Sequence, residues 1–392
     1  MKTRMGFTGD EALAYAAKQS NVDVVAAYPI TPQTIMVELF SEYVANGKVH
    51  TNFVCVESEH SAMSACVGAS LTGARVLTAT SSQGLALMHE IMYIASGLRC
   101  PIIMGVANRA LSAPINIHGD QSDMMGSRDC GWIQIYCENA QESYDWTLQS
   151  FKIAENPSVL LPVTVNLDGF ILTHAMEGVE VFTDEEAKTY LPTSKVECRL
   201  DPSKPATVGA LCLPDYYFEF KKQQDEAMKH VSPVLLKVTE EYGRLTGRKY
   251  GILEEFETKN ADVIIVCLGS TAGTVRSVAK ELRSKGKKVG LLKLWLYRPF
   301  PSKEVAAAIS EAKVVVVLDR ALSPGAPYGA LCQDIVSVMY ESKTKPIVTD
   351  MVYGLGGRDI TPPEITSIYE EALIAAKTGV VKEQVRFVGV RE

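Results

Sequence analysis

The chain has 392 residues, of which 47% are hydrophobic and 22% charged, and its formal net charge is −7 at pH 7. This balance is typical of a globular protein of two or three domains and excludes a disordered or fibrous chain. The negative charge, without any polybasic run, argues against nucleic-acid and anionic-membrane partners.

The cysteine pattern and the hydropathy favour a reduced, cytoplasmic protein. The N-terminal residues include no apolar segment of signal-peptide length, and no stretch approaches the roughly 20 apolar residues that span a bilayer. Nine cysteines are scattered without a CxxC pair. We therefore expect free thiols, and no iron–sulfur or structural zinc site held by this chain alone.

The first 170 residues alternate between helical and strand patterns with short turns. This βαβ order predicts a doubly wound domain with a parallel sheet. We expect helices at 9–20, 31–47, 59–73, 85–97 and 140–156, strands at 22–27, 51–56, 75–80, 101–107, 133–136 and 159–166, and a glycine-rich loop at 108–132.

The composition changes after this region, and the alternation of helices and strands then resumes. An acidic, proline-containing segment and a charged helix at 218–245 suggest a connector. A second, smaller α/β series follows, with strands at 262–268, 288–294, 313–318 and 346–352 and helices at 272–285 and 302–312. The predicted boundaries are 1–175, 176–258 and 259–392.

Four polar turns follow strands of the first domain, at 28–31, 57–60, 80–84 and 109–128. Because the carboxyl ends of parallel strands share one edge of a sheet, we expect these turns to line one cleft. Thr31 followed by Pro32 predicts a helix cap whose hydroxyl hydrogen is free to donate to a ligand. Arg109 is placed either to grip a carboxylate in bidentate fashion or to remain solvated.

Glu59 opens a helix directly after a strand. A carboxylate there either complements the helix dipole or handles a proton. Glu57 would raise the proton affinity of Glu59 if the two carboxylates were close, because like charges disfavour double ionisation.

Three further patterns are less specific. The turn at 80–84 is either an ordinary capping turn or a place where a ligand approaches the backbone. His118, Asp120 and Asp123 match no strong metal-binding template, so we predict no metal ligands. The glycine-rich segment 353–359 resembles a phosphate loop, but the prolines that follow leave no clean helix N-terminus.

Six segments in order resemble the α subunit of the 2-oxoacid:ferredoxin oxidoreductases: Tyr28-Pro-Ile-Thr-Pro, Glu57-Ser-Glu-His, Thr80-Ser-Ser-Gln-Gly, Ala107-Asn-Arg-Ala, Gly119-Asp-Gln-Ser-Asp and Leu167-Asp-Gly. Later segments resemble the transketolase C-terminal-type domain of that family: Val266-Cys-Leu-Gly-Ser, Leu296-Tyr-Arg-Pro-Phe-Pro and Tyr353-Gly-Leu-Gly-Gly-Arg-Asp. The resemblance implies a doubly wound thiamine diphosphate-binding domain of the pyrimidine type, followed by a smaller α/β domain.

The resemblance also implies roles for individual residues. Glu59 matches the catalytic carboxylate that hydrogen-bonds N1′ of the aminopyrimidine, and the cofactor then supplies the electron sink. Thr31 and Arg109 match positions that hold the substrate. The remaining cofactor-binding positions are Tyr28, Pro29, Ile30, Ser82 and Gln83.

The implied enzyme is incomplete in this chain, because no Gly-Asp-Gly followed by Asn is present to hold Mg²⁺ and diphosphate. The resemblance implies that a β subunit holds the Mg²⁺, the diphosphate and a [4Fe-4S] cluster. It also implies γ and ferredoxin-like δ subunits, with coenzyme A as co-substrate and ferredoxin as electron acceptor. The expected reaction is reversible oxidative decarboxylation of pyruvate to acetyl-CoA. Alternatives are a branched-chain (2-oxoisovalerate) enzyme and, in a different class, a non-catalytic nucleotide-binding or scaffold protein.

Overall fold

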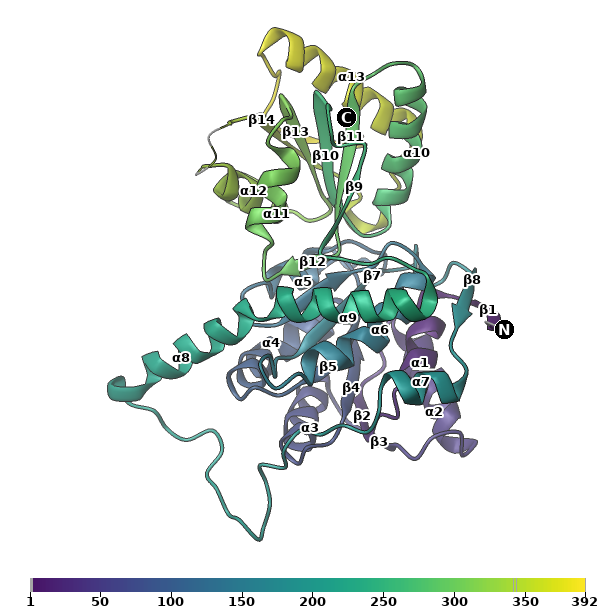
Figure 1. Cartoon of the computed structure of the whole chain (residues 1–392), viewed down its shortest axis with the longest axis vertical. Coiled ribbons are helices and arrows are strands. Elements are labelled where there is room, and N and C mark those ends of the chain that lie inside the picture. Colours follow the sequence, from purple (N-terminus) through teal and green to yellow (C-terminus); the bar gives the residue numbers. More distant parts are fainter. Residues whose placement is uncertain (1–2, 341, 343, 392) are drawn as a thin grey trace.

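Two twisted sheets, each covered by helices on both faces, lie one above the other along the long axis of the molecule (Figure 1). The computed structural model describes residues 3–340, 342 and 344–391. None of the helices in this described part is long and apolar enough to cross a membrane.

The first sheet has seven strands in the order β12-β6-β7-β5-β4-β2-β3. All neighbouring pairs are parallel except β12 with β6. Its central strands are buried on both faces, as expected for a sheet covered on both sides. The strands are β2 (Val24–Ala27), β3 (Asn52–Cys55), β4 (Val76–Thr80), β5 (Ile102–Asn108), β6 (Ile133–Tyr136), β7 (Val163–Asp168) and β12 (Leu296–Arg298).

Helices cover the two faces of this sheet. Helices α1, α2 and α6 share one apolar core with it, and α3 and α4 share another. A capping box between Thr8 and Glu11 fixes the start of α1. The helices are α1 (Gly9–Gln19), α2 (Thr34–Ala45), α3 (Glu59–Leu71), α4 (Ser82–Gly97), α5 (Ser122–Gly126) and α6 (Ala140–Ala154).

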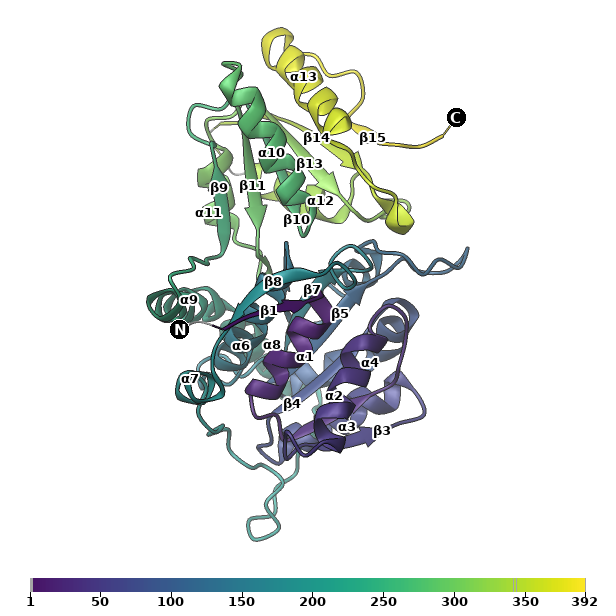
Figure 2. The same ribbon diagram turned by 90° about the vertical axis from the view of Figure 1, so that its right-hand side faces the viewer.

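The segment that follows the first sheet wraps around it. Strand β8 (Glu177–Val181) pairs in antiparallel fashion with the N-terminal strand β1 (Thr3–Phe7). Helix α7 (Asp184–Tyr190) precedes a long loop, and helices α8 (Pro214–Lys229) and α9 (Val231–Thr246) occupy the region predicted as one helix. Helix α9 packs on α6, whereas the N-terminal half of α8 projects from the body (Figure 1). Figure 2 shows the two units from the side, with α7 and α9 beside the first sheet.

The second sheet has six strands in the order β15-β14-β13-β10-β11-β9, with β9 antiparallel. Helices α11 and α12 pack on one face, and α10 and α13 on the other. The elements are β9 (Leu253–Phe256), β10 (Val263–Leu268), α10 (Thr271–Ser284), β11 (Val289–Leu294), α11 (Ser302–Ile309), β13 (Val314–Asp319), α12 (Ala330–Tyr340), β14 (Ile347–Val352), a 3₁₀ turn η1 (Leu355–Gly357), α13 (Pro362–Thr378) and β15 (Val385–Phe387).

The predicted α/β class is confirmed, and two strands tie the units together. Strand β9 comes from the predicted connector but lies in the second sheet. Strand β12 comes from the predicted second domain but pairs with β6 at the edge of the first sheet. The chain therefore crosses between the two sheets more than once.

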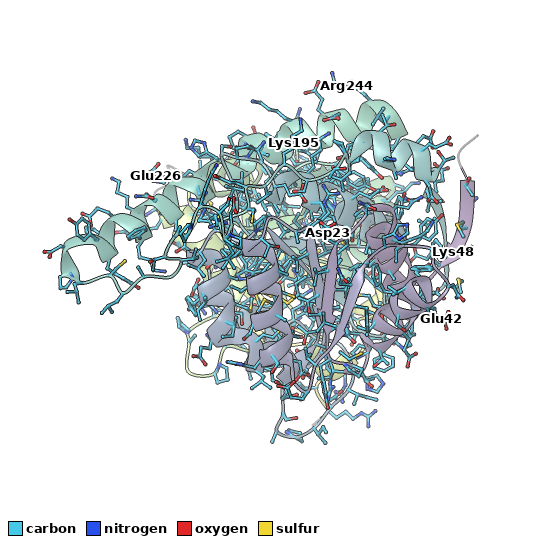
Figure 3. The ribbon with its side chains drawn as sticks, turned by 90° about the horizontal axis from the view of Figure 1, so that it is seen from below. Asp23, Glu42, Lys48, Lys195, Glu226 and Arg244 are labelled. Atoms are coloured by element: carbon cyan, nitrogen blue, oxygen red, sulfur yellow. The ribbon has the colours of Figure 1, made fainter. Side chains whose placement is uncertain are left out.

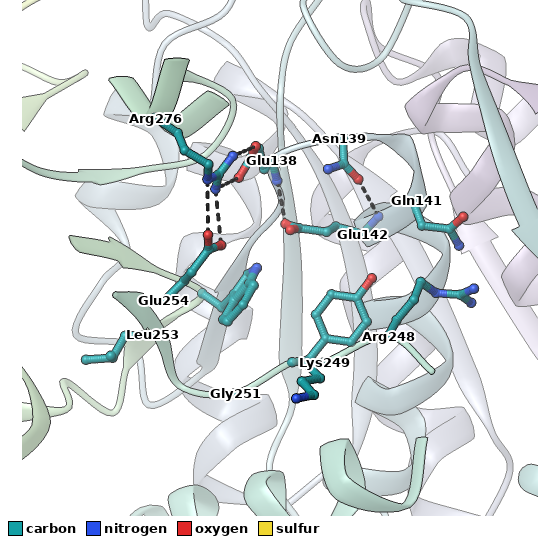
Figure 4. A pocket seen from close by; sticks show the side chains of 12 residues that line it. Glu138, Asn139, Gln141, Glu142, Arg248, Lys249, Gly251, Leu253, Glu254 and Arg276 are labelled. Atoms are coloured by element: carbon teal, nitrogen blue, oxygen red, sulfur yellow. Dashed lines mark hydrogen bonds and ion pairs between the residues drawn. The ribbon is translucent and has the colours of Figure 1, made fainter. Parts of the chain in front are cut away.

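A partly buried ionic cluster joins the units beside a groove (Figure 4). Arg276 forms bidentate hydrogen bonds with Glu138, at 2.6 and 2.7 Å, and also contacts Glu254 at 3.1 Å. Lys293 of the second sheet donates to Glu138 at 2.7 Å and to Glu142 at 2.5 Å. Burial disfavours its ammonium form, but the two carboxylates outweigh burial, so the pKa of Lys293 is raised.

Candidate active site

The turn after β2 is held by the buried side chain of Gln33. The Gln33 Nε2 donates to the carbonyl oxygens of Ala79, at 2.7 Å, and Tyr28, at 3.4 Å. Gln33 is the N-cap residue of α2, without a side-chain capping bond. The prediction that Thr31 caps this helix is wrong, because Thr31 and Pro32 lie in the turn before the helix begins. The side chain of Thr31 is exposed.

Glu59 is the first residue of α3 and is only 7% exposed. A Cβ atom on Gly84 would lie 2.6 Å from the Glu59 Oε1, so the glycine makes room for the carboxylate. Within the described chain, no hydrogen bond or ion pair engages this carboxylate. Neighbouring Glu57 is exposed and accepts a hydrogen bond from the hydroxyl of Ser61, which lowers the pKa of Glu57.

The turn between β4 and α4 bonds across the sheet edge instead of capping its own helix. The Ser81 hydroxyl donates to the carbonyl oxygen of Ala107 at 2.7 Å. The Ser82 hydroxyl oxygen lies 2.5 Å from both the carbonyl oxygen of Ala110 and the side-chain oxygen of Gln83 and shares its single hydrogen between them. These bonds fix the turn to the segment that follows β5. The Ser82 side chain is buried, whereas that of Gln83 is half-buried.

Arg109 and the turn that contains Thr31 are in direct contact. The Arg109 Nη1 donates to the carbonyl oxygen of Thr31 at 2.9 Å, and Nε donates to the carbonyl oxygen of Asn116 at 2.8 Å. The residue is 7% exposed; burial lowers the pKa of its guanidinium against the attraction of Asp123. No hydrogen bond to Nη2 is present within the described chain, so that nitrogen is available to a ligand.

Asp123 of α5 links these turns. Its Oδ2 accepts the backbone N–H groups of Ser82 and Arg109, both at 2.9 Å, and its Oδ1 accepts from the Asn108 amide, at 2.9 Å, and the Met124 N–H. Burial raises the pKa of Asp123 to about 7, against the donated hydrogen bonds. Sequence reasoning considered Asp123 only as a metal ligand and missed this positioning role.

The second unit supports the loop that holds Arg109. The N–H of Gly356 donates to Asp120 Oδ2, and the Asn116 Nδ2 donates to the carbonyl oxygen of Gly356, both at 3.1 Å. The backbone of the glycine-rich segment 353–359 therefore contacts the first unit. The described residues include no group of three His, Cys, Asp or Glu side chains placed to hold a metal ion.

A second contact lies at the end of β7. Asp168 Oδ2 accepts hydrogen bonds from the Ser270 N–H, at 2.8 Å, and its hydroxyl, at 2.5 Å, and lies 3.2 Å from Arg320 Nη1. Gln121 Nε2 donates to Asp168 Oδ1 at 3.0 Å. The Leu167-Asp-Gly segment thus joins the edge that carries the candidate site to the second sheet.

Comparison with known protein families shows to which family this chain belongs. Residues 15–240 match the family described as pyruvate flavodoxin/ferredoxin oxidoreductase, thiamine diphosphate-binding, and residues 261–365 match pyruvate:ferredoxin oxidoreductase core domain II. The chain belongs to the pyruvate:ferredoxin oxidoreductase family. This membership confirms two predictions: the chain is part of an oxidoreductase, and it contains a thiamine diphosphate-binding domain.

Members of the pyruvate:ferredoxin oxidoreductase family match nearly the whole chain. Pyruvate synthase subunit PorA of Thermotoga maritima is 50% identical over 390 residues, which is 99% of this chain and 98% of that one. The PorA subunit of Methanocaldococcus jannaschii is 50% identical over 92% of both chains. Ketoisovalerate oxidoreductase subunit VorA of Pyrococcus horikoshii is 41% identical over 97% of this chain and 96% of that one.

Solved structures of low sequence identity confirm the predicted fold class. The 2-oxoglutarate:ferredoxin oxidoreductase of Magnetococcus marinus matches with a TM-score of 0.75 and 21% identity, covering 95% of this chain and 66% of that one. A split-gene transketolase matches with a TM-score of 0.55 and 13% identity, over 94% of this chain and 99% of that one.

Proposed function

We propose that this chain is the α subunit of a pyruvate synthase, which oxidatively decarboxylates pyruvate to acetyl-CoA, reduces ferredoxin and also runs in reverse. The named relatives at 50% identity over nearly the whole chain support this assignment. The enzyme acts in the cytoplasm, and this chain is inactive without its partner subunits.

The carboxylate of Glu59 is the observation that carries the proposal. It is almost buried, has no protein partner within the described chain, and lies against a glycine whose replacement would fill the space. A carboxylate in such a place costs free energy unless a ligand hydrogen-bonds to it. The aminopyrimidine of thiamine diphosphate fits, with Glu59 holding a proton at its N1′ atom. Bound thiamine diphosphate supplies the electron sink for decarboxylation.

Thr31 and Arg109 form the substrate end of the proposed site. The exposed hydroxyl of Thr31 and the unengaged Nη2 of Arg109 belong to groups that already contact each other through the Thr31 carbonyl. A guanidinium and a hydroxyl hold the carboxylate and carbonyl oxygens of a small 2-oxoacid by charge-assisted hydrogen bonds. Asp123 keeps the Arg109 backbone in place.

The remaining proposed cofactor contacts come from the two flanking turns and from the partner subunits. The β subunit supplies the diphosphate and Mg²⁺ site and a [4Fe-4S] cluster, and γ and δ subunits serve coenzyme A and ferredoxin. The contacts from this chain are Tyr28, Pro29, Ile30, Ser82 and Gln83.

Substitution Glu59→Gln in the assembled enzyme tests the proposal. A glutamine has no proton-accepting oxygen of comparable basicity, so we expect pyruvate- and coenzyme A-dependent viologen reduction to fall ~10²-fold or more. The matched control is Glu57→Gln, an exposed neighbour, which leaves the rate unchanged. Calorimetric titration with thiamine diphosphate gives a second readout, with weaker binding to Glu59→Gln. Equal rates for the two variants would disprove the assigned role.

The rival substrate is 2-oxoisovalerate, which the VorA relative at 41% identity favours. Each additional methylene changes the selectivity of a pocket by only about 1–3 kcal/mol, and 2-oxoisovalerate has two carbons more than pyruvate, so both substrates are measured on the same preparation. We expect the higher kcat/KM for pyruvate. A complex without activity on either substrate would favour the non-catalytic scaffold.

A further inference from the structure

A cavity of about 260 Å³ lies in the second unit, between α13 and the sheet. Six apolar side chains from β13, β14 and α13 form its wall: Val314, Val316, Met351, Ile368, Ala372 and Ala375. Val314 begins β13, whereas the contacts with the first unit follow the ends of β13 and β14, at Arg320 and Gly356. Figure 2 shows α13 at the top of the second unit. The cavity is therefore separate from the candidate active site.

The volume of the cavity limits the size of a ligand. Protein interiors rarely leave a void larger than a water molecule, so a space of this size between α13 and the sheet is unusual. An apolar cavity of roughly 150 Å³ in another protein holds benzene, with its six carbon atoms. By proportion, the cavity of about 260 Å³ holds a molecule of about ten non-hydrogen atoms.

One polar side chain on the wall of this cavity has no partner. Thr349 is only 4% exposed, and its hydroxyl oxygen has no hydrogen-bond partner within the described chain. Thr349 and Met351 are two residues apart on β14, so both project from the sheet face that α13 covers. A buried hydroxyl without a partner costs free energy, and a ligand with an acceptor oxygen removes this cost.

A guanidinium group lies at the mouth of the cavity. Arg386 of β15 is directly opposite Met351, so it projects from the same sheet face as Thr349. The Arg386 Nη1 donates to Glu371 of α13 at 2.6 Å, and the arginine side chain remains 32% exposed. Within the described chain, no hydrogen bond engages its Nε or Nη2. These two nitrogens are placed to hold a carboxylate in bidentate fashion.

We propose that this cavity binds a monocarboxylic acid with an apolar tail of about seven carbons. The tail lies against the apolar wall, and the carboxylate accepts hydrogen bonds from Thr349 and Arg386. Lys382 and Glu383 also line the cavity, and their opposite charges offset each other, so the N–H and O–H donors select the anion. None of these residues belongs to the proposed active site, so the proposed function and this site are tested separately.

Calorimetric titration with straight-chain acids tests the size of the site in the isolated chain and in the assembled enzyme. The probe is octanoate, for which we expect a dissociation constant on the order of 0.1–1 mM. Each buried methylene strengthens binding about fourfold, so hexanoate binds about 15-fold more weakly. Decanoate exceeds the cavity and binds no better than octanoate. Affinity that continues to rise through decanoate and dodecanoate indicates nonspecific adsorption and overturns the proposal, as does tighter binding of octylamine than of octanoate.

Two substitutions test the polar contacts. Thr349→Val removes the hydroxyl, so we expect about fivefold weaker octanoate binding, while the melting temperature of the free chain stays the same or rises. Arg386→Gln removes the cation, so we expect about tenfold weaker binding of octanoate and an unchanged affinity for octanol. The matched control is Arg244→Gln on α9, an exposed arginine 3.7 Å from Glu240, with less than a twofold change. Figure 3 shows Arg244 at the periphery of the molecule.

A third substitution tests the cavity itself. Ala372→Leu fills the space from α13, so we expect octanoate binding to fall at least ~10-fold without a loss of melting temperature. Unchanged octanoate affinity in any of the three variants overturns the proposal, and so does the absence of saturable binding to the wild type at millimolar concentrations. Binding to the isolated chain that is lost in the assembled enzyme assigns the cavity to a segment of a partner subunit, and also overturns it.

Discussion

At the scale of single residues, three residues that we assign no ligand contact shape the candidate site. Gln33 fixes one turn, Gly84 makes room for Glu59, and Asp123 holds the backbones of Ser82 and Arg109. The family resemblance pointed to Glu59, Thr31 and Arg109, whose proposed roles are untested. It did not identify Gln33 or the positioning role of Asp123, because both act through hydrogen bonds between segments far apart in sequence.

Substitution Asp123→Asn tests this positioning. Both carboxylate oxygens accept N–H groups, so the amide NH₂ of asparagine must face a donor. We expect the free energy of unfolding to fall by about 1–3 kcal/mol in urea denaturation. The control is Asp129→Asn, whose side chain is 74% exposed, and it changes stability little. Equal stability of both variants would contradict the positioning role.

The difference in stability between the wild type and Asp123→Asn should depend on pH. Burial raises the pKa of Asp123 from 3.8 in the unfolded chain to about 7 in the folded one, so the folded state binds more protons between these values. The stabilisation from protonated Asp123 is complete below about pH 4 and is lost as pH rises through 7. The stability advantage of wild type over Asp123→Asn should therefore shrink from pH 4 to pH 8 in urea titrations. An advantage that grows with pH would contradict the raised pKa.

At the scale of elements, the βαβ rhythm and the polar turns after the strands were accessible from sequence, because apolar periodicity and turn residues are local signals. The start of α2 could not be predicted from the sequence. Thr31-Pro32 has the local chemistry of a cap, yet the tertiary bonds of Gln33 move the helix start to Thr34. The short strand β12 was also missed, because its three residues acquire strand structure only against β6.

The loop with Gly356 contacts the segment that holds Arg109, at the proposed substrate end of the site. A Cβ at Gly356 would collide with Asn116, whose carbonyl oxygen holds Arg109. For Gly356→Ala we expect KM for pyruvate to rise on the order of tenfold with a smaller change in kcat. Gly286→Ala is the control, because its φ is also positive, +76°, but nothing lies within 4 Å of its Cβ position. Each change strains the backbone by about 1–2 kcal/mol, so equal KM values in steady-state assays would disprove the link.

At the scale of the whole molecule, contacts at three places join the two sheets, so we expect them to unfold as one cooperative unit. The ionic cluster around Lys293, the contacts of Asp168 and the strand β12 all cross between them. None of these contacts could be read from the sequence, because a buried lysine and a surface lysine look alike until the partner carboxylates are placed.

Substitution Lys293→Met tests this cooperativity. It leaves Glu142 buried without a cation, so we expect a loss of about 3–5 kcal/mol and separate calorimetric transitions for the two sheets. The control is Lys285→Met, which breaks an exposed pair with Glu281 and changes stability by about 0.5 kcal/mol or less. A single, unshifted transition in Lys293→Met would contradict the role of the cluster.

The strand β12 also has a consequence for biosynthesis. It closes the outer edge of β6, a fully buried strand that would otherwise offer open backbone groups to other chains. The ribosome completes β6 long before residues 296–298 emerge, with a delay of ~10–30 s at ordinary translation rates. Throughout that interval the edge of β6 stays open, so we expect the nascent first sheet to pair with other chains more readily than the finished protein does, until β12 covers this edge.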